Sequence, residues 1–194
     1  MTNDTTHNSS SPIFIMGYMA CGKTTFGRAL GRASGREFID LDFRIEQRFH
    51  TTVSEIFRTR GESGFRKIES EMLREVAEME NVIVACGGGT PCFNDNMDLM
   101  LANGHTVWLD SSIERIVMRL MANRSKRPLM ADKRPEELTE AVTKGIEPRI
   151  PYYSRARIRL SGDRLEDRTQ ISDTVESFIS MHPEIFLAET ELNS

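Results

Sequence analysis

Residues 17–24 read Gly-Tyr-Met-Ala-Cys-Gly-Lys-Thr and match the pattern G-x-x-x-x-G-K-[ST]. A loop of this pattern turns its backbone N–H groups inward at the start of a helix, where they bind the negative charge of linked phosphates. Lys23 would reach the outer phosphates as a point charge, and the Thr24 hydroxyl would bind Mg²⁺. Because the apolar run Ile13–Met16 precedes the loop and an amphipathic stretch follows it, we expect a nucleotide-binding loop and not a chance glycine-rich turn.

Two aspartates, Asp40 and Asp42, stand at the end of a second strand-like stretch, residues 37–42. Side chains alternate along a strand, so both carboxylates would point to the same side if the extended backbone persists. One could then hold Mg²⁺, directly or through water, while the other accepts a hydrogen bond from a substrate hydroxyl. The alternative is that the aspartates cap the next helix or loop, a frequent role at strand ends.

Three consecutive glycines, Gly87, Gly88 and Gly89, follow the apolar strand expected over residues 81–86. They could form only a sharp turn, or they could mark a place where a ligand comes so close to the backbone that any Cβ would collide with it. Three glycines exceed what a turn requires, so we favour a segment whose backbone contacts a ligand.

Arginines stand at two further places of interest. Arg66 lies four residues after Glu62, so it could form a surface ion pair, or it could serve as a two-pronged donor for a carboxylate or phosphate. Residues 124–134 carry five basic side chains against Asp132 in a chain of net charge −4. That segment could be a solvated loop, or a lid that excludes water and neutralises a transferred phosphoryl group.

Composition limits the class of protein. The 194 residues, with 39% hydrophobic and 28% charged side chains, fit one globular domain. The net negative charge argues against general nucleic-acid binding. An apolar run of the roughly 20 residues that span a bilayer is missing, so we expect no membrane association. An odd number of cysteines and a polar start without a leader pattern indicate a cytoplasmic protein.

The three cysteines, Cys21, Cys86 and Cys92, lack the spacing of zinc ligands. Cys21 could be a reactive thiol at a helix start or simply a small loop residue. If the strands that lead to Cys21 and Cys86 were neighbours, oxidation could join the two thiols and block nucleotide binding.

Strand-like and helix-like stretches alternate along the chain, which predicts a parallel sheet with helices on both faces. We expect strands over residues 13–16, 37–42, 81–86, 106–110 and 158–160. We expect helices from the loop to Gly35, over 43–49, around 54–58 with Ser54 as N-cap, from the break at 61–64 to Met79, over 95–103, from Ser111 or Ser112 to Ala122, and over 136–146 and 171–181. Ligands collect at the carboxyl ends of parallel strands, which places the loop, the aspartates and the glycines on one rim.

Together these motifs resemble the shikimate kinases, a family of P-loop enzymes with a nucleoside-monophosphate-kinase-like fold. The resemblance covers residues 13–156 and rests on the order and spacing of the elements. They are the phosphate loop, Asp40-Leu41-Asp42 followed by Ile45-Glu46, Gly61-Glu62 with Phe65-Arg66, Gly87-Gly88-Gly89, Arg127-Pro128-Leu129, and Arg149-Ile150-Pro151-Tyr152-Tyr153.

The resemblance implies an α/β fold of three layers, α/β/α, with a five-stranded parallel sheet in the order 2-3-1-4-5. It implies one domain over residues 12–182, with a substrate-binding segment at about 42–72, a lid at about 123–135, a disordered tail over 1–11 and a C-terminal tail over 183–194. The implied reaction moves the γ-phosphoryl group of ATP to the 3-hydroxyl of shikimate, with Mg²⁺ as cofactor, on the route to aromatic amino acids. We expect a monomer.

The family's functional residues can be placed one by one. The catalytic roles fall on Asp42, which orients and deprotonates the hydroxyl, on Lys23, and on the lid residue Arg127. The nucleotide would contact Gly17, Ala20, Cys21, Gly22, Lys23, Thr24, Thr25 and Arg127. Shikimate would contact Asp42, Arg66, Gly87, Gly88, Gly89 and Arg149, with the two arginines on its carboxylate. Thr24 and Asp40 would hold Mg²⁺.

The chain departs from the family pattern where Ala20 and Cys21 replace Gly-Ala or Gly-Ser, and where Cys86 replaces Thr or Ser. Two other functions compete with the implied one. A related small-molecule kinase, such as a gluconate kinase, would not need both arginines. A regulatory module that binds nucleotide without chemistry should have lost at least one of Asp42, Arg66, Arg127 and Arg149.

Overall fold

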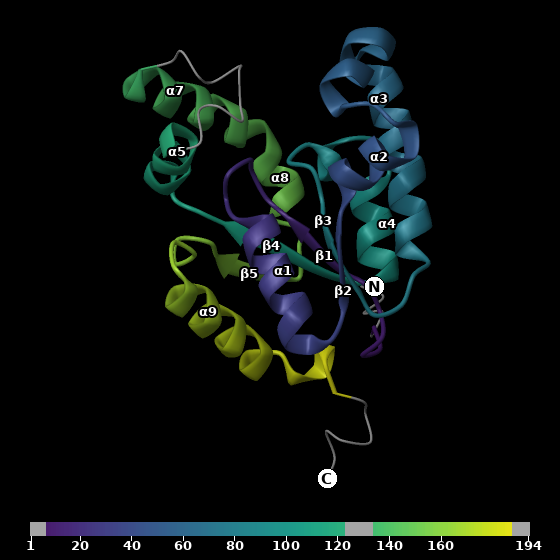
Figure 1. Cartoon of the computed structure of the whole chain (residues 1–194), viewed down its shortest axis with the longest axis vertical. Helices are drawn as coiled ribbons and strands as arrows, with labels where there is room; N and C mark the ends of the chain where they lie inside the picture. Colours follow the sequence, from purple (N-terminus) through teal and green to yellow (C-terminus); the bar gives the residue numbers. More distant parts are fainter. Residues whose placement is uncertain (1–6, 123–133, 188–194) are drawn as a thin grey trace.

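A computed structural model describes residues 7–122 and 134–187 of the chain. Its centre is a five-stranded parallel sheet in the order β2-β3-β1-β4-β5, as expected (Figure 1). The strands are β1 (Ile13–Met16), β2 (Glu37–Asp40), β3 (Val82–Ala85), β4 (His105–Asp110) and β5 (Ile158–Ser161).

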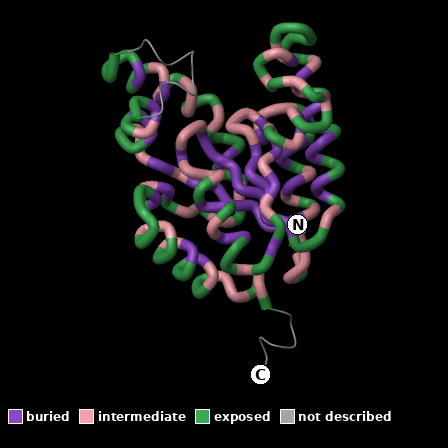
Figure 2. The backbone as a smooth tube through the Cα atoms, in the orientation of Figure 1, coloured by how far each residue is buried: buried purple, intermediate pink, exposed green. Residues whose placement is uncertain are grey.

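Burial explains the residue types of the strands (Figure 2). β1 and β3, in the middle of the sheet, are buried at every position, which is why they read as continuous apolar runs. In the edge strands β2 and β5, Ile39 is the one buried residue and the other residues are half-buried or exposed, because one side of each strand faces solvent.

Helices cover both faces of the sheet (Figure 1). They are α1 (Lys23–Ser34), α2 (Leu41–Phe49), α3 (Val53–Ala77), α4 (Asn96–Asn103), α5 (Ile113–Ala122), α7 (Pro135–Ile146), α8 (Ile150–Tyr153) and α9 (Arg168–Met181), with short 3₁₀ turns η1 (Thr90–Cys92), η3 (Glu147–Arg149) and η4 (Pro183–Ile185). α1 and α9 pack on one face, and the apolar sides of α2, α3, α4, α5, α7 and α8 pack on the other. Successive residues of β1 alternate between these two cores, so the sheet has the expected three-layer order.

The second strand is shorter than expected. It ends at Asp40, and α2 begins at Leu41, so Asp42 lies in the first turn of a helix and not on an extended strand. Asp40 is the N-cap of α2, and its side chain accepts a hydrogen bond from the Phe43 N–H at 3.3 Å. The strand-alternation argument for the two carboxylates is therefore wrong, and the capping alternative holds for Asp40.

The substrate-binding segment also differs in its caps. Thr52, not Ser54, caps α3 through its hydroxyl, which accepts from the Glu55 N–H at 3.2 Å. The break expected over residues 61–64 narrows to Gly61, the one position inside α3 with non-helical angles, φ 68° and ψ 178°. The expected lid falls almost wholly on residues 123–133, outside the described residues, and only Arg134 and Pro135, at the start of α7, are seen.

The described fold extends into both expected tails, residues 1–11 and 183–194. Ser10 accepts a hydrogen bond from the Asn81 N–H at 2.7 Å, so the stretch before β1 is anchored to the loop before β3. Ile185 of η4 is fully buried in the core on the α1 side of the sheet. Arg36 joins the two ends, because its guanidinium donates to the carbonyls of Ser9, Ser11 and Ile185.

In the described parts of the chain, every helix is either too short or too polar to cross a lipid bilayer.

Candidate active site

The phosphate loop joins β1 to α1 and contains two positions that only glycine fits. Gly17 has φ 144°, and a Cβ there would lie 2.3 Å from the carbonyl oxygen of Leu109. Gly22 has φ 108°, and its Cβ would lie 2.7 Å from Cδ1 of Leu165. At Gly17 both the positive φ and the backbone contact exclude a side chain, while at Gly22 the positive φ strains any residue with a Cβ and the Leu165 side chain would have to shift. These two glycines therefore set the shape of the loop.

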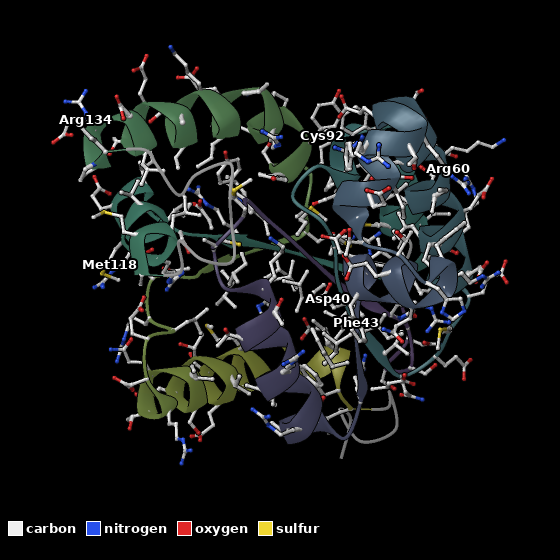
Figure 3. The ribbon with its side chains drawn as sticks, turned by 45° about the horizontal axis from the view of Figure 1, so that its top comes forward. Asp40, Phe43, Arg60, Cys92, Met118 and Arg134 are labelled. Carbon is white, nitrogen blue, oxygen red and sulfur yellow. The ribbon has the colours of Figure 1, made fainter. Side chains whose placement is uncertain are left out.

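The charged groups of the loop are held in place by the loop itself. The Lys23 ammonium donates to the carbonyl oxygens of Gly17 at 2.8 Å and Tyr18 at 2.9 Å. The Thr24 hydroxyl donates to Oδ2 of Asp40 at 3.0 Å. Asp40 thus links the start of α1 to the start of α2, where Figure 3 shows it beside Phe43.

A cavity of about 630 Å³ opens at the carboxyl ends of the strands. Its walls come from the phosphate loop, the β2–α2 junction, the end of β3, α5 and the segment after β5. The lining residues are Met19, Ala20, Gly22, Lys23, Thr24, Thr25, Asp40, Asp42, Ala85, Cys86, Gly87, Gly88, Arg119, Leu165 and Glu166. The structure therefore brings both aspartates, Lys23 and two of the three glycines to one cavity. The aspartates reach this cavity from the start of α2 and not, as expected, from an extended strand.

Asp42 is a carboxyl group of this cavity whose pKa is strongly raised. Burial, and then the negative charges of Glu69, Asp40 and Glu46, raise its pKa from 3.8 to about 6, and Lys23 opposes this rise. A carboxylate with such a pKa is ionised at neutral pH and still basic enough to accept a proton from a hydroxyl group.

The triple glycine makes room for side chains of the site. A Cβ on Gly87 would lie 3.1 Å from Oε1 of Glu69 and 3.2 Å from Oδ1 of Asp42. A Cβ on Gly89 would lie 2.7 Å from Nη2 of Arg66. The absence of side chains at these positions thus lets two carboxylates and a guanidinium lie directly against the backbone.

Arg66 is held more firmly than a surface ion pair would require. Only 14% of its side chain is exposed, and it donates to Glu69 at 2.9 Å and to Glu62 at 3.2 Å. Its guanidinium lies over the Phe93 ring, 4.0 Å from the centroid. The ion pair of Arg66 with Glu62 exists, as the simpler alternative proposed. Glu62 is its exposed partner, whereas Arg66 and its second partner, Glu69, are largely buried.

Arg149 ends η3, and its guanidinium donates to the Gly145 carbonyl and lies 5.4 Å from the centroid of the Tyr18 ring. Neither arginine lines the main cavity, but the charges of both act on Cys92. Burial raises the pKa of the Cys92 thiol, and the positive charges of Arg149 and Arg66 lower it. In Figure 3, Cys92 lies between α8 and the α2–α3 pair. The positive charges of both guanidinium groups therefore reach the Cys92 side chain.

Some expected residues are not brought to the cavity. Cys21 is fully buried, and its N–H donates to the Tyr18 carbonyl. Gly17, the first residue of the loop, does not line the cavity. Arg127 falls outside the described residues. The strands that lead to Cys21 and Cys86 are neighbours, as the disulfide hypothesis requires. Cys21, however, belongs to the core on the α1 face and Cys86 to the core on the opposite face, which argues against a bond between the two thiols.

Other residues of the site did not follow from the motifs. Leu165 and Glu166 close the cavity from a segment in which the sequence showed no motif, and Arg119 closes it from the helix expected up to Ala122. Glu69 is fully buried and accepts hydrogen bonds from Arg66 at 2.9 Å and Thr90 at 2.6 Å. Its signal in the sequence was a charged residue within the apolar stripe of α3, and such residues are buried only when paired.

The oxygen atoms near the loop suit magnesium. Residues 7–122 and 134–187 hold no cluster of three or more His, Cys, Asp or Glu side chains that could bind a metal by itself. The Thr24 hydroxyl and the Asp40 carboxylate are 3.0 Å apart in the same cavity. Such a sparse set of hard oxygen donors fits Mg²⁺, which keeps several waters and binds substrate phosphates.

Comparisons with known proteins agree with this geometry. The sequence model of the family described as shikimate kinase matches residues 19–180. A shikimate kinase of Phocaeicola vulgatus is 48% identical over 165 residues, which are 85% of this chain and 94% of that protein. The crystal structure of shikimate kinase from Bacteroides thetaiotaomicron superposes with a TM-score of 0.86 and 44% identity, covering 89% of this chain and 98% of that one.

More distant structures extend the likeness. Shikimate kinase from Acinetobacter baumannii, in complex with shikimate, has a TM-score of 0.76 and 28% identity over 90% of this chain and 93% of that one. A gluconokinase from Sinorhizobium meliloti has a TM-score of 0.50 and 14% identity over 90% of this chain and 97% of that one, a likeness that concerns the fold alone. On the extent of these matches, and on the site they accompany, the chain belongs to the shikimate kinase family.

Proposed function

We propose that this chain catalyses the transfer of the γ-phosphoryl group of ATP to the 3-hydroxyl of shikimate, which gives shikimate 3-phosphate and ADP. The observation that carries the proposal is that Lys23 and Asp42 line the same cavity, with the pKa of Asp42 raised to about 6. One residue can therefore stabilise the moving phosphoryl group while the other handles the proton of the acceptor.

ATP would place its phosphates in the loop between β1 and α1. Lys23, which now donates to two loop carbonyls, would turn its ammonium to the outer phosphates and balance the charge on the transferred group. Thr24 and Asp40 would hold Mg²⁺, which neutralises phosphate charge when it is bound. The direct hydrogen bond between these two residues keeps their oxygens within reach of one ion.

Asp42 would accept the hydrogen bond of the 3-hydroxyl and then its proton. The hydroxyl oxygen forms a bond to the γ-phosphorus, the bond from that phosphorus to the bridging oxygen of ADP breaks, and the proton passes to a carboxylate oxygen of Asp42. Burial and the nearby carboxylates, which raise the pKa of Asp42, make it a better base than an exposed aspartate.

Shikimate carries a carboxylate, which we assign to Arg66 and Arg149. Both guanidinium groups lie near Cys92, and Arg66 is already fixed by Glu69. A planar guanidinium can grip a carboxylate in two places, and a lysine cannot. The backbone of residues 87–89 would contact the ring, and Arg127 would close over the phosphates of ATP as a lid residue.

The proposal is tested by measuring ADP release from MgATP with shikimate, gluconate and a set of nucleoside monophosphates offered separately. Release that depends on shikimate alone supports the proposal. ADP release with gluconate alone would indicate a related small-molecule kinase. ATP that binds without any release of ADP would favour a regulatory module. We further propose that the protein works as a monomer in the cytoplasm, which sedimentation and cell fractionation would check.

A further inference from the structure

Tyr18, the second residue of the phosphate loop, has its backbone and its ring in different surroundings. Its carbonyl oxygen accepts a hydrogen bond from the Lys23 ammonium at 2.9 Å. Its side chain does not line the cavity, is only 6% exposed, and lies in the core to which α7 and α8 contribute. The proposed binding of phosphates therefore does not explain why this position carries a tyrosine.

The tip of the Tyr18 ring packs against the backbone of Gly145, in the last turn of α7. A Cβ on Gly145 would lie 2.2 Å from Oη and 2.9 Å from Cζ of Tyr18. Inside a helix, alanine is otherwise the better helix former. Gly145 therefore leaves the space that the Tyr18 ring occupies, and the phosphate loop packs directly on the end of α7.

Arg149 is held by the same two residues. Its guanidinium donates to the Gly145 carbonyl and lies 5.4 Å from the centroid of the Tyr18 ring, within the range of a cation–π attraction. Without such contacts, an arginine at the end of a short 3₁₀ turn would spread over many rotamers. Tyr18 thus contacts Arg149 directly and also packs against the residue that accepts its hydrogen bond.

We propose that Tyr18 is a positioning residue for the acceptor, because its ring holds Arg149 in the orientation that receives a carboxylate. Through Tyr18, the loop that holds Lys23 also sets the place of a positive charge in the acceptor site. The inference rests on the proposed function, in which Arg149 binds the carboxylate of shikimate.

The test compares two substitutions of Tyr18. Tyr18→Leu keeps an apolar side chain in the core and removes the ring, and Tyr18→Phe keeps the ring and removes the hydroxyl. The Kd of shikimate and the Kd of MgADP are each measured by calorimetry, without the other ligand. The matched control is Tyr152→Leu, because Tyr152 lies three residues after Arg149 on α8 but is 38% exposed.

In Tyr18→Leu we expect the Kd of shikimate to rise roughly threefold to thirtyfold, the range that cation–π contacts give between exposed and desolvated sites. The Kd of MgADP should change less than about twofold, because the Tyr18 oxygen that accepts from Lys23 belongs to the backbone. Tyr18→Phe and Tyr152→Leu should leave both Kd values within about twofold of the parent protein. A residue that served stability alone would not separate the two ligands.

Gly145→Ala tests the packing of the ring separately. The added Cβ would displace the Tyr18 ring, so the Kd of shikimate should rise about as much as in Tyr18→Leu. In the Tyr18→Leu background the same substitution should add less than about twofold, because the smaller side chain leaves room for the Cβ.

Equal increases in the two Kd values, or unchanged shikimate affinity in Tyr18→Leu, would overturn the inference. If Tyr18→Leu does not fold, Gly145→Ala must weaken shikimate binding and not MgADP binding, or the inference fails.

A parent protein that does not bind shikimate would refute the proposed function, and urea unfolding then decides the inference. Tyr18→Leu and Arg149→Met together should change the equilibrium constant of unfolding by at least about threefold less than the product of their separate effects, because they remove the same contact. Additive effects would show that Tyr18 does not hold Arg149.

Discussion

Asp42→Asn should make the protein more stable and nearly inactive. In the folded chain, burial and the charges of Glu69 and Asp40 raise the pKa of Asp42 from 3.8 to about 6. Because the folded state binds this proton more tightly than the unfolded state, stability decreases as the pH rises from about 4 to about 6. Above that window the ionised carboxylate lowers the free energy of unfolding by up to about 3 kcal/mol.

Asp42 is partly accessible to solvent, which screens the effect, so we expect Asp42→Asn to raise the free energy of unfolding at pH 7.5 by about 1–2 kcal/mol. The assay is urea unfolding of both proteins from pH 4 to pH 8. The difference between them should be near zero at pH 4, should grow up to about pH 6 and should stay constant above it. MgADP affinity should change little, while kcat should fall by about 10²–10⁴ because the base is lost.

Two results would refute this reasoning. A variant that is equally or less stable at pH 7.5 would show that the carboxylate is not in an unfavourable environment. A variant that keeps near-normal kcat would show that Asp42 does not take the proton. The two measurements are independent, so the electrostatic and the chemical parts of the argument can fail separately.

Three further substitutions test other contacts. Arg66→Lys should raise the KM of shikimate about tenfold or more with a smaller change in the KM of ATP, because the two-pronged grip is lost; equal changes in initial-rate kinetics would contradict this. Gly22→Ala, at φ 108° and with its Cβ 2.7 Å from Leu165, should weaken MgADP binding at least tenfold by calorimetry, and unchanged affinity would show that the loop adapts. Arg36→Met leaves the carbonyls of Ser11 and Ile185 without this donor and should lower the free energy of unfolding by about 2–4 kcal/mol, with unchanged KM values; a stable variant would mean that water replaces the guanidinium.

Much of the fold could be predicted because its signals are local. The buried runs Ile13–Met16 and Val82–Ala85 have one interpretation in an alternating chain, and Gly35 ends α1 as expected. The stretch 37–42 was misread, since Leu41 serves equally well as a strand residue and as a buried residue of a helix. Only the N-cap geometry of Asp40, which depends on the three-dimensional path of the chain, shows that Leu41 belongs to a helix and not to the strand.

The site was predictable where a motif carries the chemistry and not where distant segments meet. The pattern of residues 17–24 predicted the loop between β1 and α1, whereas Asp42 reaches the cavity from the start of a helix and not from the strand that its neighbours suggested. The contacts of Arg119 join residues 20, 21, 162 and 166, and no local pattern reports contacts across 40 to 100 positions. The Arg66 pairing with Glu69 was also missed, although the two are three residues apart, because a simpler partner, Glu62, lies four residues before Arg66.

The carboxylates of the site explain why its other residues are what they are. Glu69 is fully buried. Its negative charge contributes to the raised pKa of the nearby Asp42. Two such groups are tolerated only with a cation and hydrogen-bond donors nearby, which Arg66 and Thr90 supply to Glu69. Gly87 leaves the space in which both carboxylates approach the backbone. The residue that holds Arg66 in place is therefore also one that makes Asp42 basic, so a change at Glu69 should impair acceptor binding and proton transfer together.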